Sequence, residues 1–560
     1  MPNKRKQTLF EPKLITVLKK YNRADFKTDI RAGINVGIVA LPLSIAFGVL
    51  SGLSPQEGLL AAIVAGFLTA LLGGSRVQIA GPTGASAVMI LGVLHSHGKE
   101  GLIVCTVLSG LLLVIFGLSR LGGLIKYIPR PLTVGFTSCI AVIIFSSQVK
   151  DLLGLQIAGL PAGFLEKWIS YWQNGHTASL PAALIALFSI GIMTGWPRLH
   201  GKFAKSLPAP FVVLVVNALL VFAFKIPVET IGSKFGALKF APQVIDLSLF
   251  SWPLIQEMLP TAFTIAILGA MVSLLSAVVG DGMIDGRHRS NTELIAQGFA
   301  NIACGVLGGM PSQGAVARTV TNVKHGAKTP IAAMMHSFAL LLILLIFGKA
   351  AAFVPLACLA GILVVVSYNM SEWRSVLSLL QSTRSDAAIL ITTFTLGVLT
   401  NLTLAMEAGF ILTLLLFIQR MNSTTQFTDI LEDLESEEEL QLPQLPEGAE
   451  IYEVDGPLYF ASAIEFLQTM RMVAAQAKVQ ILYLRRTNMI DASGLYVLKQ
   501  FYRECSQAKI TLVLAGIHTQ PLRALNRSGL LKQIGRKNVR LKLGSAIARA
   551  EEILRKQKTV

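Results

Sequence analysis

Apolar segments long enough to cross a lipid bilayer recur along most of this chain, and they constrain its fold more than any other feature. They begin at Gly33 and continue to Ile418 in a sequence of 560 residues. A membrane-crossing helix needs about 20 apolar residues to cover roughly 30 Å of hydrocarbon. The sequence therefore predicts a polytopic α-helical membrane protein. We read fourteen spans, two of them short, at 32–50, 56–73, 82–94, 101–118, 131–148, 180–196, 209–225, 260–280, 292–308, 312–323, 329–348, 352–369, 387–400 and 404–420.

Composition excludes several other classes. Hydrophobic residues make up 53% of the chain and charged residues 14%, against roughly 25% charged residues in soluble domains. So much apolar surface excludes a disordered chain, and five cysteines in 560 residues form no disulfide framework. The net charge of +17 is concentrated in residues 1–422, which carry +15, whereas residues 423–560 carry +2. This distribution favours the Lys/Arg bias of cytoplasmic loops over a nucleic-acid surface.

The loop charges predict the orientation of the chain. Residues 1–31 form a basic arm with nine Lys and Arg and no signature of a cleavable secretory signal. With this arm in the cytoplasm, fourteen basic residues lie in cytoplasmic loops and seven in outer loops. The positive-inside rule then predicts an even number of spans and both termini in the cytoplasm. We expect a multi-pass protein of the cell (inner) membrane.

The two short spans have matching sequences and matching positions. Each opens with Gly, Pro, a hydroxyl residue and small residues, beginning at Gly81 and at Gly309, and each is the third span of a set of seven. An odd number of spans per set implies that the two sets are inverted relative to each other. Paired, Gly/Pro-interrupted short segments are typical of the midplane site of a transporter. The predicted site residues here are Thr83, Gly84, Ala85, Ser86, Gln313, Gly314 and Ala315.

Two half-helices that start near the middle of the bilayer form an anion site from their backbone. Each helix start carries a partial positive charge and unpaired N–H groups. Arg318 lies inside the second short span, four residues after Gly314, and we expect it on the same helix face. An ionisable residue at this depth is a candidate functional group. The alternatives are that the small residues serve helix packing and that Arg318 forms a structural ion pair.

The C-terminal part predicts a small α/β domain after an acidic linker. The linker covers residues 423–449 and the domain residues 450–560. We expect strands at 451–454, 458–461, 479–484 and 510–515, with helices at 462–477, 492–507, 519–529 and 544–557. No catalytic constellation, metal site or cofactor-binding loop is expected. One loop between a strand and a helix stands out, and helix capping by Asp491 is the alternative to a functional role.

The sequence resembles the sulfate permease (SulP) family of anion transporters. The resemblance covers nearly residues 25–555, and the C-terminal part looks like the STAS domain of these proteins, with Asp491, Ser493 and Gly494 in its signature loop. Within the family, the sequences at 451–460 and 273–279 look closest to the bacterial C4-dicarboxylate and bicarbonate transporter branch. The segments that carry the membrane resemblance are 40–48, 74–76 with 81–83, 291–298 and 317–319.

The resemblance implies a seven-plus-seven inverted repeat within residues 32–422. Spans one to four and eight to eleven would form a core domain that moves past a gate domain in elevator fashion, usually in a homodimer. It also implies that Ser44 and Phe47 of span one line the anion site. One departure concerns span eight, where Val272 stands at the position of an acidic residue in that branch and Ser276 follows. The missing carboxylate puts coupling to Na⁺ or H⁺ in doubt.

The function expected from the sequence is secondary transport of small inorganic or carboxylate anions, such as sulfate, bicarbonate or C4-dicarboxylates. The alternatives are an anion channel of the same architecture and a membrane-tethered STAS signalling scaffold. Enzymatic activity has no residues to support it. The expected partners are the anion, the lipid bilayer, a second copy of the chain and a cytoplasmic regulator on the STAS domain. Sequence leaves open which anion is carried, whether Ser493 is phosphorylated and what the STAS domain binds.

Overall fold

In the computed structural model the chain forms two compact units, residues 1–412 and 413–560. The first unit is helical and the second contains a five-stranded sheet. The structure describes residues 10–19, 21–123, 129–157, 159–161, 163–198, 207–240, 242–243, 245–422, 426–429, 445–459, 466–467, 469–470 and 477–558.

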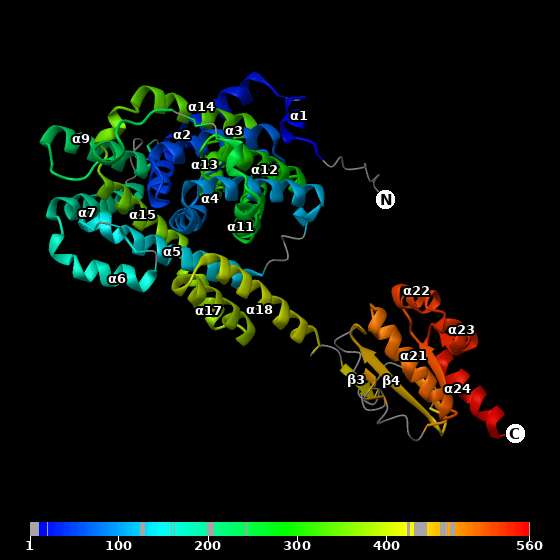
Figure 1. Ribbon diagram of the computed structural model, residues 1–560. Coiled ribbons are helices and arrows are strands. Elements are labelled where there is room, and N and C mark those ends of the chain that lie inside the picture. Colours follow the sequence, from blue (N-terminus) through cyan, green and yellow to red (C-terminus); the bar gives the residue numbers. More distant parts are fainter. Residues whose placement is uncertain are drawn as a thin grey trace. The chain divides into compact units, whose positions relative to one another are not determined.

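The membrane unit consists of helices and one very short pair of strands (Figure 1). The strands are β1 (Ala80–Gly81) and β2 (Gln313–Gly314). The helices are α1 (Lys13–Leu18), α2 (Arg23–Leu50), α3 (Pro55–Leu72), α4 (Gly84–Leu118), α5 (Arg130–Leu153), α6 (Phe164–Gln173), α7 (Leu180–Gly195), α9 (Ala209–Phe224), α10 (Ile231–Phe235), α11 (Trp252–Ile284), α12 (Ser290–Val306), α13 (Val316–Lys324), α14 (Pro330–Phe347), α15 (Leu356–Met370), α16 (Trp373–Leu380), α17 (Arg384–Leu399) and, extending into the second unit, α18 (Leu402–Asn422).

Each of the fourteen apolar ranges read from the sequence overlaps a helix of the described chain. Two of these ranges fall within α4, which is broken at Gly98 by a φ of 63°. A glycine tolerates this left-handed backbone without steric cost, so it separates the two halves of α4. By length and composition, eight of the described helices could each cross a membrane. The last part of the basic arm, from Arg23 onward, is helical and belongs to α2.

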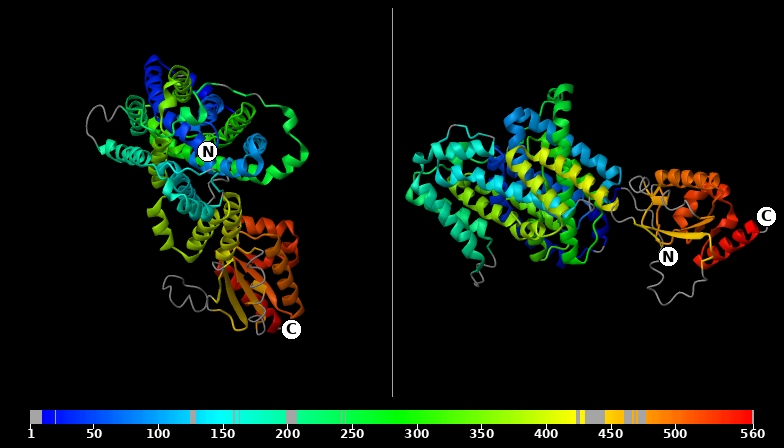
Figure 2. Two further views of the ribbon diagram at one scale, coloured as in Figure 1. Left: turned by 60° about the vertical axis from the view of Figure 1, so that its left-hand side comes forward. Right: turned by 90° about the horizontal axis from the view of Figure 1, so that it is seen from below.

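The helices of the membrane unit pack in two groups. Helices α2, α3 and α4 pack against α11, α12, α13 and α14, as the two views in Figure 2 show. The second group joins α5 to α15 and α17, and α7 to α15 and α9. Helix α18 packs on this second group, since its Gly409 lies against Thr393 of α17 and Leu132 of α5. The candidate site lies within the first group and is approached by the second.

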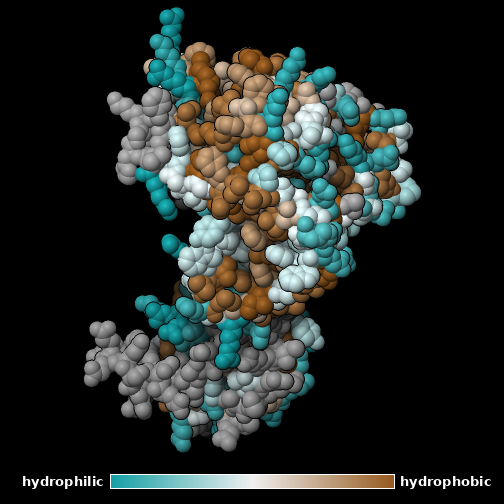
Figure 3. All heavy atoms as spheres, turned by 90° about the vertical axis from the view of Figure 1, so that its left-hand side faces the viewer, coloured by the Kyte–Doolittle hydropathy of each residue, from teal (hydrophilic) through white to brown (hydrophobic). Residues whose placement is uncertain are grey.

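Large apolar side chains cover the outside of the membrane unit. On α7, Leu180 and Leu187 are 72% and 65% exposed, and Phe222 and Phe224 of α9 are 60% and 73% exposed. Figure 3 shows such side chains gathered over the face that carries these helices. Contiguous apolar surface of this extent marks an interaction with a membrane or another protein. Together with the length of the helices, it indicates a multi-pass membrane protein.

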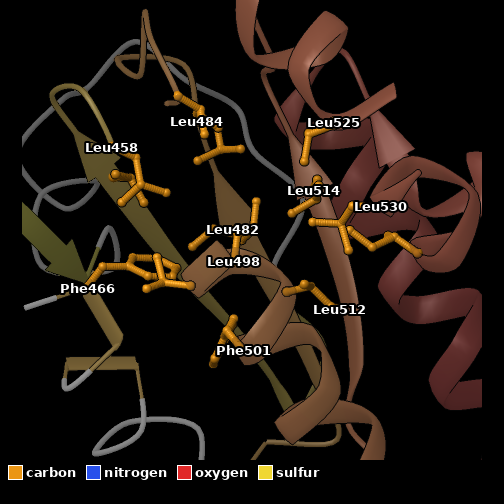
Figure 4. Close-up of a cluster of buried hydrophobic side chains, with 14 of the residues drawn as sticks. Leu458, Phe466, Leu482, Leu484, Leu498, Phe501, Leu512, Leu514, Leu525 and Leu530 are labelled. Atoms are coloured by element: carbon orange, nitrogen blue, oxygen red, sulfur yellow. The ribbon is translucent and has the colours of Figure 1, made fainter. Parts of the chain in front are cut away.

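The second unit has a five-stranded sheet with helices on both faces. The strand order is β3-β4-β5-β6-β7, with β3 antiparallel to β4 and the other pairs parallel. Helices α21, α22 and α23 cover one face through a cluster around Leu482, Leu498 and Phe501 (Figure 4), and α24 covers the other. The bounds are β3 (Gln426–Asp429), β4 (Ala449–Asp455), β5 (Val479–Tyr483), β6 (Thr511–Ala515), β7 (Val539–Arg540), α21 (Ala492–Gln507), α22 (Thr519–Arg527), α23 (Leu530–Ile534) and α24 (Leu543–Lys558).

Three details of this unit differ from the sequence-based expectation. Strand β3 lies inside the range 423–449 that was expected to be a linker, and β7 was not expected. The strand expected at 458–461 is an isolated bridge between Leu458 and Ile490, and residues 460–461 lie outside the described residues. Of the helix expected at 462–477, the structure describes only 466–467, 469–470 and 477.

Candidate functional site

The two short-helix segments of the sequence meet directly in an antiparallel ribbon. Ala80 of β1 pairs with Gly314 of β2, and Gly81 pairs with Gln313. The backbone N–H of Ala315 extends the ribbon by donating to the Ile79 carbonyl at 2.8 Å. Because β1 leads into α4 and β2 leads into α13, this pairing brings together two helix starts that are more than 230 residues apart in the sequence.

Thr83 begins α4 as the sequence predicts. Its hydroxyl accepts a hydrogen bond from the Ser86 N–H, and the Ser86 hydroxyl accepts one from the Thr83 N–H at 3.1 Å. This reciprocal arrangement is a capping box, which satisfies two otherwise unpaired donors. The side-chain amide of Gln313 also donates to the Thr83 hydroxyl. Thr83 and Gln313, both expected at the site, are therefore in direct contact.

The second short helix starts later than expected. The Pro311–Ser312 pair was read as its start, but α13 begins at Val316, with Ala315 as N-cap. Residues 313–314 are extended because they pair with β1, and the Ser312 N–H donates to the Asn301 side chain at 2.9 Å. Gly314 therefore lies in a strand rather than one helical turn before Arg318.

Arg318 lies in the first turn of α13 and is 2% exposed. Its Nη2 donates to the Pro82 carbonyl at 3.2 Å and to the Ser44 hydroxyl at 3.4 Å. Its Nη1 has no hydrogen-bond partner among the described residues. A Cβ on Gly81 would lie only 2.5 Å from Nη1, so the glycine makes room for the guanidinium. The alternative of an ion pair finds no carboxylate partner for Arg318 in the described part of the chain.

The structure places Ser44, but not Phe47, in hydrogen-bond contact with a predicted site residue. Ser44 is fully buried and accepts the bond from Arg318. Phe47 lies three residues further along α2 and is 5% exposed. Its carbonyl accepts from Ser51, which ends the helix.

The region around position 272 is polar but uncharged. Val272 is half-buried, and the Ser276 hydroxyl lies 2.8 Å from the Thr319 hydroxyl. The neighbouring Ser273 hydroxyl accepts a hydrogen bond from the Gly314 N–H at 2.9 Å. The one acidic residue at the start of the next helix, Glu293, is engaged elsewhere, since its carboxylate accepts from the backbone N–H groups of residues 74 and 75.

Sequence reasoning missed two polar residues that hold the second segment in place. Gln297 donates to the Ser312 carbonyl at 2.7 Å, and Asn301 accepts from the Ser312 N–H. Both are buried on α12. The sequence contained this signal, because Gln297 and Asn301 are four residues apart in the apolar part of α12 that follows Glu293, and residues at this spacing share one helix face.

The second helix group touches the start of α4. A Cβ on Gly84 would lie 2.7 Å from Ile144 of α5 and 3.2 Å from the sulfur of Met370 at the end of α15. Further along α4, Val88 and Met89 line a cavity of about 680 Å³. Ionisable groups around this cavity include both signs of charge: His95, His97, Lys150, Asp151, Lys167, Lys234 and Glu407.

In the second unit, the signature loop has a structural explanation. Asp491 is the N-cap of α21, and its carboxylate accepts from the Gly494 N–H at 2.8 Å. A Cβ on Gly494 would lie 2.3 Å from the Leu458 carbonyl, so the position needs glycine. Ser493 is half-buried in the first turn. At the other end of α21, burial raises the pKa of the Cys505 thiol to about 12, which leaves it unreactive at neutral pH.

Comparison with known proteins identifies the class and then the family. The sequence model of the sulfate permease family matches residues 26–393, and that of the STAS domain matches residues 443–546. These matches define a multi-pass membrane protein with an appended STAS domain. The chain belongs to the sulfate permease family.

The relatives cover nearly the whole chain. The putative sulfate transporter YvdB of Bacillus subtilis (strain 168) is 35% identical over 523 residues, which are 93% of this chain and 97% of that protein. The bicarbonate transporter BicA of Picosynechococcus sp. is 29% identical over 468 residues, 80% and 81% of the two chains. The structure of SLC26A9 matches with a TM-score of 0.85 over 98% of this chain and 93% of that one; at 17% identity it shows the fold alone. YvdB and BicA are named as transporters, in agreement with the expectation of no enzymatic activity.

Proposed function

We propose that this protein is a secondary transporter that moves small inorganic or carboxylate anions across the plasma membrane. One observation carries the proposal: the ribbon of β1 and β2 joins the starts of two short helices inside a membrane unit. Helix starts offer unpaired N–H groups and a partial positive charge to an anion. Arg318 adds a buried cation whose Nη1 is without a hydrogen-bond partner in the described part of the chain.

The substrate site is assigned to both segments and to α2. The proposed binding residues are Ser44, Phe47, Thr83, Gly84, Ala85, Ser86, Gln313, Gly314, Ala315 and Arg318. The names of relatives, which include sulfate and bicarbonate transporters, support small oxyanions as the substrate class.

Fourteen crossings in two inverted sets of seven fit the packing of the helices. The first helix of one set, α2, packs on α14, the fourth of the other set. Likewise α11 packs on the second half of α4 through Leu113, Ala266 and Ala270. The fifth helices, α5 and α15, pack on each other. Matched contacts of this kind, with antiparallel pairing of β1 and β2, are what a two-fold axis in the membrane plane would produce.

Elevator movement would carry the first helix group, with the site, past the second. The cavity of about 680 Å³ lies between these groups, lined by α2 and α4 on one side and by α5, α17 and α18 on the other. With both termini in the cytoplasm, this cavity opens on the outer side. We further propose a homodimer, and exchange or facilitated flux without strict Na⁺ or H⁺ coupling, because Val272 and Ser276 offer a cation no carboxylate.

Uptake of radiolabelled anions by proteoliposomes tests the proposal. Sulfate, bicarbonate, chloride and succinate compete for entry in a screen with one labelled anion at a time. Saturable uptake that is lost on substitution of Gln313 and Arg318 supports transport through this site. Large single-channel currents would instead support the channel alternative, and absence of any anion flux would support the scaffold.

A further inference from the structure

Charge is strongly segregated within the second unit. Residues 505–550 contain nine Lys and Arg and no Asp or Glu, whereas residues 421–470 contain twelve Asp and Glu and no Lys or Arg. The net charge of residues 423–560 is only +2, so this separation does not show in the total charge. Along the sequence, the second unit therefore has one acidic segment and one basic segment.

The sheet topology places the basic residues together. They follow β6 in sequence and occupy α22, α23, the turn at 536–538 and β7, which is the last strand of the order β3-β4-β5-β6-β7. Strand β7 pairs only with β6 among the described strands, so it is an edge. We call this surface the basic edge, and its residues are Arg523, Arg527, Lys532, Arg536, Lys537, Arg540 and Lys542.

The charges of the basic edge are available to a partner. All but Arg540 are exposed, and none of the exposed six forms an ion pair within the described part of the chain. By contrast, acidic residues of β4 at the other side are partly neutralised, since Arg486 binds Asp455 at 3.0 Å and approaches Glu453 at 4.0 Å. The two carboxylates of β4 that a second copy would offer to the basic edge are thus already paired.

A large, exposed apolar side chain lies among these basic residues. Leu541 is 78% exposed and lies between Arg540 and Lys542, directly after β7. An apolar residue flanked by Lys and Arg is suited to a membrane interface, where it enters the headgroup region while the cations stay at the surface. The domain is also tied to the membrane unit, because only residues 423–425 separate α18 from β3.

We propose that the basic edge binds the surface of an anionic phospholipid bilayer, with Leu541 inserted between the headgroups. Polybasic segments close to a membrane are attracted to anionic lipids, and the attraction falls with ionic strength. Binding at this edge would hold the domain against the membrane and make its position depend on lipid composition. Such attachment of the domain to the membrane is separate from anion transport and does not depend on which anion is carried.

The test uses the full-length protein in vesicles with a fluorophore on a new cysteine. The five native cysteines are buried, so Gln533→Cys on α23 is labelled selectively; Tyr496→Cys, 70% exposed on α21, is the control position. Vesicles contain phosphatidylcholine alone or with about one third phosphatidylglycerol, plus a lipid whose headgroup quenches the fluorophore. We expect quenching at position 533 only in the anionic vesicles, and its loss when KCl is raised from about 0.05 M to about 0.5 M.

Charge variants make the test specific. Each removed basic residue should weaken attachment roughly fivefold, so Arg536→Gln with Lys537→Gln should abolish most of the quenching. Arg555→Gln with Lys556→Gln removes equal charge from α24, where both residues pair with Glu551 and Glu552, and should leave it unchanged. The proposal would be overturned by equal quenching in neutral vesicles or by no quenching at all. It would also be overturned by quenching that depends on the density of the protein in the vesicles rather than on lipid charge, and this result would indicate a second copy of the chain as the partner.

Discussion

The side-chain amide of Gln313 donates a hydrogen bond to the hydroxyl of Thr83, which is also the N-cap of α4. This bond links the two short-helix segments beyond the two paired residues of each strand. It makes the geometry of one helix start depend on a residue of the other. The binding of an anion near either helix start should therefore depend on both residues.

Gln313→Ala and Thr83→Val should each reduce anion uptake, and the double variant should lose less than the sum of the two effects, because both remove the same bond. Thr83→Val also removes the helix cap and should cost about 1 kcal/mol of stability. Thr83→Ser keeps the hydroxyl and serves as control. Uptake and thermal unfolding of the purified variants measure both effects; full additivity would contradict the direct coupling.

Arg318→Ala should weaken anion binding by roughly tenfold to a hundredfold, since a hydrogen bond to a charged group contributes about 1.5–3 kcal/mol. It also leaves the Pro82 carbonyl and Ser44 without this donor. Arg384→Ala, an exposed arginine at the start of α17, is the matched control. Equilibrium binding of the transported anion is the measurement, and an unchanged dissociation constant would remove Arg318 from the site.

Gly314→Ala should disrupt the ribbon. The added Cβ would lie 2.2 Å from the Gln78 side chain and 2.8 Å from the Cα of Ser273, and the second contact is backbone that cannot rotate away. Gly92→Ala provides the comparison, because nothing lies within 4 Å of a Cβ there and alanine favours a helix by roughly 0.5–1 kcal/mol. Thermal unfolding in detergent should show a lower midpoint for the first variant and an equal or higher one for the second.

Val272→Asp should introduce cation dependence into the transport. A bound Na⁺ needs several oxygen ligands and a negative charge to offset its desolvation. Ser273 and Ser276 already supply hydroxyls beside this position. Uptake with and without a Na⁺ gradient, or across pH, should differ for the variant but not for the original chain. A strong gradient dependence of the original chain would show that coupling uses other groups.

Deletion of residues 450–560 should leave anion binding intact and act on stability, assembly or regulation. All proposed site residues lie in the membrane unit, which forms its own compact body up to residue 412. The measurement is anion binding by the truncated protein in detergent, after its monodispersity has been checked. It shows whether anion binding resides in the membrane unit alone. Loss of binding in a well-folded truncated protein would contradict it.

The helical framework could be predicted because long apolar runs carry their own signal. The start of α4 could also be predicted from the sequence, because Thr83 caps it through hydrogen bonds to the neighbouring Ser86. The start of α13 could not, because residues 313–314 are held extended by β1, a partner far away in the sequence. A two-residue strand leaves no periodic pattern, and local rules favoured a helix beginning at Ser312.

The second unit shows the same limit. Strands β5 and β6 are largely apolar, and β4 alternates buried apolar residues with acidic ones, so all three were predictable. Strand β3, by contrast, lies in a polar, acidic stretch and forms by pairing with β4. Strand β7 has two residues and depends on β6. Capping of α21 by Asp491 was predictable from the sequence, because it depends on neighbouring residues. The requirement for glycine at position 494 was not, because it arises from a tertiary contact with the Leu458 carbonyl.

The central claim is that the paired starts of α4 and α13 form the anion site of a transporter. Trans-stimulated uptake tests it most directly: proteoliposomes loaded with unlabelled anion take up the same labelled anion while Na⁺ and H⁺ gradients are collapsed. We expect saturable uptake by the original chain and strongly reduced uptake by Gln313→Ala and Arg318→Ala, at equal amounts of reconstituted protein. Undiminished uptake by both variants, or uptake by the original chain that vanishes when the gradients collapse, would contradict this account.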